Sequence, residues 1–134
     1  MIEHPWVDYD GTLFVLRFPA APTVEEILGF GHATDVFYSQ NESPIAWVID
    51  GSRISLQGVR HRKALSEVLE RDRSHLAEHC LAMAIVVPNP MVRGAAQAVL
   101  WLAPPGYPYA FFGDLERARD WATERLFETA GCVG

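Results

Sequence analysis

The sequence of 134 residues has little that marks an extracellular or membrane protein. It contains two cysteines, Cys80 and Cys132, whereas small disulfide-stabilised domains carry four, six or more. No apolar run approaches the ~20 residues that span a bilayer. Residues 1–5 contain neither a basic nor an apolar segment, so we expect no signal peptide. Cys132 is third from the end and does not fit the four-residue prenylation motif. These features predict a reduced, cytoplasmic protein.

Positive charge is also scarce. The chain has 11 Lys and Arg against 17 Asp and Glu, which gives a net charge of -6. Nucleic-acid binding requires clustered Lys and Arg. The densest basic cluster is Arg60, Arg62 and Lys63. It is soon followed by Glu67 and Glu70, which is typical of the solvated face of a helix. We therefore expect no nucleic-acid partner.

Motifs of nucleotide binding and covalent catalysis are missing. There is no Walker loop, no Gly-x-Ser-x-Gly motif and no Gly-x-Gly-x-x-Gly after a strand. His75, Glu78 and His79 fit the short H-x-x-E-H zinc pattern, but the sequence offers no third ligand. Cys80 lies at the C-terminus of a predicted helix, where the helix dipole does not activate a thiol. We predict no catalytic residues, no metal and no cofactor, and hence no enzyme activity.

The composition is that of an ordinary globular domain. Hydrophobic residues make up 49% of the chain and charged residues 21%. A chain of this length can bury a core as one domain, here residues 1–134.

The hydrophobic pattern predicts nine elements in the order β-β-α-β-α-β-α-β-α. A hairpin over residues 6–18 turns at Asp10-Gly11. Thr23 and Glu26 form a capping box at the start of the first helix. Strands and helices then alternate, which implies parallel strands joined by right-handed crossovers. The elements after the hairpin are expected at strands 44–50, 81–87 and 107–112, and at helices 24–39, 56–79, 90–102 and from residue 115 on.

All four helices carry apolar stripes that we expect to face the core. In the helix over 56–79, the segment 71–74 is expected to kink or interrupt the helix. The stripes of the helices over 56–79 and 90–102 consist of Leu65, Val68, Leu69 and Leu76, and of Val92, Ala95, Ala96 and Val99.

Four features in this order resemble the STAS domains of the anti-sigma factor antagonists, and more closely their SpoIIAA-like relatives. The hairpin comes first, and a later strand ends in Val48-Ile49-Asp50. A buried strand over 82–87 leads into the segment 89–93. The segment 111–118 looks like the family's ending, an aromatic strand that runs into a helix. The resemblance covers essentially the whole chain and implies an α/β fold, a mixed, mostly parallel sheet with helices packed mainly on one side.

The resemblance also implies a bacterial signalling protein that regulates a partner by contact, without catalysis. In the antagonists, a serine after the Asp-ended strand is phosphorylated within an Asp-Ser-Ser-Gly-like motif. This sequence departs from that motif, and Ser52 and Ser55 are the candidate phosphosites. Because ligands on open α/β sheets bind at the carboxyl ends of strands, we expect partner contact there. The predicted partner-binding residues are Asp50, Ser52, Ser55, Asn89 and Arg93; Asp50 and Arg93 are also candidates for a structural ion pair.

Other possibilities remain open at this point. Trp101, Tyr107 and Tyr109 form a docking or self-association patch if they are exposed together, so a homodimer is possible. Alternatively, the chain carries a small apolar ligand in a cleft between helices and sheet, lined by Phe14, Phe30, Phe37, Trp47 and Trp101. A third hypothesis is a metal-dependent hydrolase that uses His75, Glu78 and His79.

Overall fold

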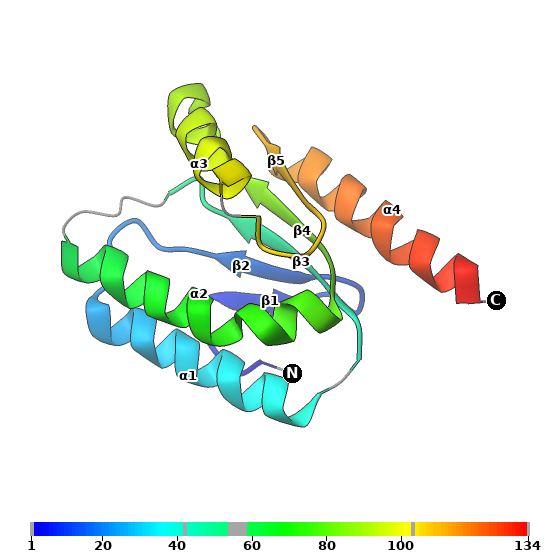
Figure 1. Cartoon of the computed structure of the whole chain (residues 1–134), viewed down its shortest axis with the longest axis horizontal. Coiled ribbons are helices and arrows are strands. Elements are labelled where there is room, and N and C mark those ends of the chain that lie inside the picture. The colour runs from blue at the N-terminus through cyan, green and yellow to red at the C-terminus, as the bar shows by residue number, and fades with distance from the viewer. Residues whose placement is uncertain (1, 42, 54–58, 103, 134) are drawn as a thin grey trace.

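The computed structural model describes residues 2–41, 43–53, 59–102 and 104–133. The predicted order of elements is confirmed (Figure 1). The strands are β1 (Val7–Tyr9), β2 (Phe14–Arg17), β3 (Ile45–Asp50), β4 (Cys80–Val86) and β5 (Tyr109–Phe112), and the helices are α1 (Val24–Gln40), α2 (Val59–His79), α3 (Pro90–Leu102) and α4 (Leu115–Val133).

The five strands form one mixed, mostly parallel sheet in the order β1-β2-β3-β4-β5. The hairpin strands β1 and β2 pair antiparallel, and every later pair is parallel, as predicted. The hairpin turns at Gly11, whose φ of 92° is readily accessible only to glycine. The Asp10 side chain accepts hydrogen bonds from the amides of Thr12 and Leu13, which fixes the turn.

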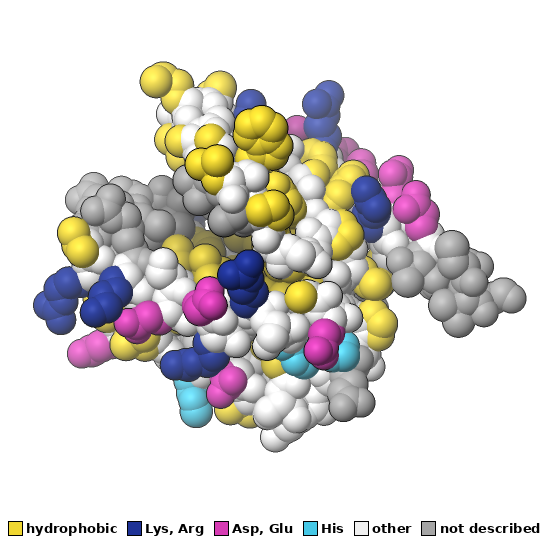
Figure 2. All heavy atoms as spheres, in the orientation of Figure 1, with side chains coloured by type: hydrophobic (Ala, Val, Ile, Leu, Met, Phe, Trp, Pro, Cys, Tyr) yellow, Lys and Arg dark blue, Asp and Glu magenta, His cyan; other side chains and the backbone are white. Residues whose placement is uncertain are grey.

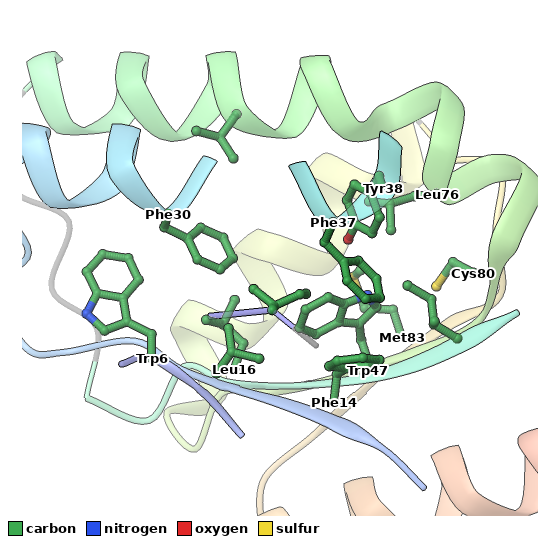
Figure 3. Packing of buried hydrophobic residues seen from close by; sticks show 14 of the residues in the cluster. Trp6, Phe14, Leu16, Phe30, Phe37, Tyr38, Trp47, Leu76, Cys80 and Met83 are labelled. Carbon is green, nitrogen blue, oxygen red and sulfur yellow. The ribbon is translucent and has the colours of Figure 1, made fainter. Parts of the chain in front are cut away.

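Helices cover both faces of the sheet. Helices α1 and α2 lie over one face, where aromatic side chains dominate the core (Figures 1 and 3). There the Phe14 ring lies 5.3 Å from Phe37 and 5.2 Å from Trp47, centroid to centroid. Helix α4 packs on the opposite face, where Ala118 and Ala122 are fully buried. Alanines at this spacing let the helix approach the strands closely.

The crossing of α1 and α2 depends on one glycine and one polar pair. A Cβ atom added to Gly31 would lie 2.6 Å from Cγ2 of Val68. The Thr34 hydroxyl lies 2.9 Å from Oδ2 of Asp72 and 3.0 Å from the Gly31 carbonyl. Both Thr34 and Asp72 are buried. Burial raises the pKa of the Asp72 carboxyl to about 6, although the hydrogen bond from Thr34 acts to lower it.

Helix α2 differs from its prediction in three respects. It is uninterrupted from Val59 to His79, so the predicted kink is wrong; residues 56–58 lie outside the described residues. The chain enters β4 at Cys80, one residue earlier than predicted. Leu69 is 53% exposed and Leu65 is half-buried, because the helix is rotated relative to the predicted stripe. The side chains that it buries are Ala64, Val68, Asp72 and Leu76.

Helix α3 does not bury the predicted stripe. None of its described side chains is buried, and Val92 is 53% exposed. Ala95 is also exposed, Ala96 is half-buried, and the side chain of Val99 lies outside the described residues. Figure 1 shows the helix beyond the carboxyl ends of β3 and β4, so it does not pack on a face of the sheet.

Candidate binding site at the carboxyl ends of the strands

The loops that follow β3, β4 and β5 meet at one edge of the sheet. Asp50, Val86 and Phe112 are partners in the parallel register. Beyond them, the Gly51 amide donates to the Val86 carbonyl at 3.0 Å, and the Val87 amide donates to the Phe112 carbonyl at 2.9 Å. The predicted juxtaposition of these strand ends is therefore present.

The polar side chains at this edge are engaged in local turns and caps. The Asp50 carboxylate accepts from the Ser52 hydroxyl at 2.6 Å and from the Ser52 amide at 3.1 Å. Asn89 accepts from the amides of Met91 and Val92 and thereby caps α3. Ser52 and Asn89 are exposed, so a partner can reach both. Ser55 lies outside the described residues.

Arg93 bridges the loop that follows β4 and the loop that follows β5. Its Nη1 donates to the Val87 carbonyl at 3.0 Å and lies 3.5 Å from the Pro88 carbonyl oxygen. The same nitrogen would be 3.0 Å from a Cβ atom at Gly113, so the guanidinium fits against a residue that has no side chain. The ion pairs within the described part of the chain do not include one between Asp50 and Arg93. Arg93 instead holds α3 to the ends of β4 and β5.

Beside these polar loops lies an apolar surface that α1 and α2 leave uncovered. Ile49 and Ile85 point to the same face as the aromatic core, yet both are only half-buried. They lie near the carboxyl ends of β3 and β4, and α3 lies beyond those ends (Figure 1). Figure 2 shows a hollow between α2 and α3 with hydrophobic side chains at its bottom. Uncovered apolar surface of this kind marks a binding site more specifically than exposed polar groups do.

Helix α3 forms one wall of this hollow and is unusually apolar for an exposed helix. Met91, Trp101 and Leu102 are 85%, 81% and 84% exposed. Figure 2 shows hydrophobic side chains gathered over this helix. The sequence interpretation missed Met91 and Leu102 as surface residues. A signal was available, because α3 contains a single charged residue, Arg93, where a solvated helix has a charged face.

The three aromatic residues predicted as one patch occupy different environments. Trp101 projects from α3, whereas Tyr107 and Tyr109 pack against the aromatic core and are half-buried. Burial raises the pKa of Tyr107 to about 12. The Tyr109 and Phe111 rings meet edge to face with centroids 6.2 Å apart. Of these three side chains, Trp101 is thus the exposed one.

The histidines of the zinc-like pattern stack on aromatic rings. The His75 ring lies 4.4 Å from the Tyr38 ring and 4.4 Å from the His79 ring, and His79 Nε2 lies 3.7 Å from the Glu78 carboxylate. Within the described ranges, no three His, Cys, Asp or Glu residues gather as a metal site. Burial raises the pKa of the Cys80 thiol to about 12, which opposes formation of a nucleophilic thiolate.

The aromatic residues predicted to line a ligand cleft mostly form the closed core. Phe30 and Trp47 are buried between the sheet and α1, and Trp101 lies apart on α3. Phe14 and Phe37 are buried too, but their edges reach a groove of about 990 Å³ between α1 and the β1–β2 hairpin. His4, Tyr9 and His32 are among the other residues that line this groove.

Comparison with known proteins supports the fold. No family model matches the sequence, and no curated protein matches it. A solved structure from Shewanella loihica PV-4 matches with a TM-score of 0.67 and 14% sequence identity, over 87% of this chain and 90% of that one. It is described as an uncharacterized protein of the DUF3478 family with a SpoIIAA-like fold. The resemblance drawn from the sequence is thus confirmed at the level of the fold. Across the described helices, none is long and apolar enough to cross a membrane.

Proposed function

We propose that this domain is a non-enzymatic regulatory module that binds a protein partner at the carboxyl ends of its strands. The observation that carries the proposal is the half-buried pair Ile49 and Ile85 near the carboxyl ends of β3 and β4, beyond which lies α3, a helix that buries none of its described side chains. The SpoIIAA-like fold supports the proposal, because the resemblance to anti-sigma factor antagonists implies regulation by protein contact.

The partner supplies an apolar segment to the hollow between α2 and α3. At 100° per residue, Leu100 lies on the same side of α3 as Arg93, and its side chain is half-buried. The exposed Ser52 and Asn89 lie on the rim, where polar contacts fix orientation and contribute less to affinity. Phosphorylation of Ser52 would place a second negative group beside Asp50 and break the 2.6 Å hydrogen bond, which offers a means of switching the rim.

The experiment places a photo-crosslinking residue at Leu100 in the full chain, expressed in its own host, with Glu116 on α4 as the control position. We expect one discrete protein adduct from position 100 and none from 116. The captured protein is then purified and titrated against the Leu100→Glu variant and against Ala98→Glu, which adds the same charge to the opposite side of α3. We expect Leu100→Glu to weaken binding at least tenfold and Ala98→Glu to leave it unchanged. Equal binding by wild type and Leu100→Glu would overturn the proposal.

A second candidate function is the carriage of a small apolar ligand. The observation that favours it is the hydrophobic bottom of the hollow (Figure 2). This candidate predicts a small molecule of fixed mass on the freshly purified protein, lost from Leu100→Glu. If no protein is captured and such a molecule is present, the second candidate replaces the first.

A further inference from the structure

The side of α3 that faces away from the strands has no partner within the described part of the chain. Taking 100° per residue, the half-buried Arg93, Ala96 and Leu100 define the inner side of the helix. The opposite side carries residues that are all exposed and uncharged: Met91, Gly94, Ala95, Ala98 and Leu102, with Trp101 at its margin. We call these six residues the outer face. It inverts the usual pattern, in which the apolar side of a helix faces inward and the charged side faces water.

The sizes of these side chains follow a symmetric profile along the helix. Large side chains stand at the two ends, Met91 at one and Trp101 with Leu102 at the other. Between them, Gly94, Ala95 and Ala98 form a low centre. Two antiparallel helices with this profile fit each other: their low centres cross, and Met91 of each copy meets Leu102 of the other. A two-fold contact requires such self-complementarity.

Charge also favours a second copy of this chain. Two chains with a net charge of -6 repel each other, and a contact without charged residues keeps like charges apart, at distances where salt screens the repulsion. The outer face has no charged residue, and the only charge on the helix, Arg93, donates to carbonyls on the inner side. A lipid surface fits less well, because helices that lie on membranes carry Lys and Arg beside their apolar face and anionic lipids repel an acidic chain.

We propose that the outer face of α3 is a self-association surface at which two copies of this chain pair across a two-fold axis between Ala95 and Ala98. At exposures of 81–85%, Met91, Trp101 and Leu102 present roughly 500 Å² of apolar surface per copy. The pair then buries about 1,000 Å² in total, an area typical of weak and transient complexes. The dimer is therefore concentration-dependent, with a dissociation constant on the order of 10–100 μM. This surface is distinct from the hollow of the proposed function, which uses the inner side of α3.

Sedimentation equilibrium of the full chain between about 1 and 500 μM tests the proposal. We expect the average mass to rise from monomer toward dimer for the wild type. Ala98→Glu places a charge at the two-fold axis and is expected to remain monomeric over the whole range. Gln97→Glu adds the same charge to the same helix beside the outer face, and Leu100→Glu adds it to the inner side; both are expected to dimerise as the wild type does.

A wild type that stays monomeric at 500 μM would overturn the inference, and so would equal dimerisation of wild type and Ala98→Glu. Flotation with neutral phosphatidylcholine vesicles, lost in Ala98→Glu but not in Gln97→Glu, would assign the outer face to lipid and overturn it as well. None of these results depends on whether Leu100→Glu loses a protein partner, so the inference and the proposed function can fail separately.

Discussion

Replacing Gly31 by alanine is expected to lower the free energy of unfolding by about 2 kcal/mol. The new Cβ would lie 2.6 Å from Cγ2 and 3.3 Å from Cγ1 of Val68 on α2. A valine in a helix has essentially one χ1 rotamer, so its methyl groups cannot turn aside. Helices α1 and α2 must then separate, which also disturbs the buried Thr34–Asp72 pair one turn away. Urea unfolding followed by circular dichroism measures the change.

Gly29 provides the matched control on the same helix. A Cβ atom there meets nothing within 4 Å, so Gly29→Ala is expected to raise stability by about 0.5–1 kcal/mol through helix propensity alone. The double variant Gly31→Ala with Val68→Ala removes the colliding methyl groups and is expected to show a favourable coupling of at least about 1 kcal/mol. If Gly31→Ala were as stable as Gly29→Ala, the close helix crossing would be wrong.

Replacing Asp72 by asparagine is expected to stabilise the protein by about 3 kcal/mol near pH 8 and by less than about 1 kcal/mol near pH 4. Burial holds the pKa of the Asp72 carboxyl at about 6 in the folded chain, above the ordinary aspartate value of 3.8 that applies in the unfolded chain. Folding therefore takes up a proton between these values. The contribution of Asp72 to stability is fully present below pH 3.8 and is lost as the pH rises through 6. Asparagine keeps the shape and the acceptor for Thr34 without a charge.

The measurement is urea unfolding of both proteins at several pH values from about 4 to 8. Asp35→Asn is the control, because Asp35 is an exposed neighbour on α1 that raises the Asp72 pKa only as a secondary cause. It is expected to change stability by less than about 0.5 kcal/mol. A difference between wild type and Asp72→Asn that stays constant with pH would show that Asp72 is not a buried carboxyl with a raised pKa.

Local signals in the sequence were reliable because each is decided by a few neighbouring residues. The Asp10-Gly11 turn, the capping box of Thr23 and Glu26, and the cap at Asn89 are all present with the expected hydrogen bonds. Alternation of strands and helices was then enough to predict a mostly parallel sheet, which the pairing confirms.

The orientation of two helices could not be predicted in the same way. Helix α3 carries its one charged residue, Arg93, on the side that faces the strands, so periodicity favours the wrong side as the inner one; the bonds from Arg93 to the Val87 and Pro88 carbonyls decide the orientation. Helix α2 buries a stripe that contains Asp72. Because a buried aspartate is rare, the sequence pattern favours the neighbouring leucines as the buried residues, so the predicted orientation of the helix is wrong. The hollow depends on both rotations and was therefore visible only in three dimensions.

Native mass spectrometry of the full chain, freshly purified from its own host, tests most directly the claim that this domain binds a protein at its strand ends. We predict masses of the bare monomer and dimer, and of the monomer with a protein partner that Leu100→Glu no longer retains. A stoichiometric small apolar molecule or metal ion on the wild-type chain, with no protein partner, would contradict the account.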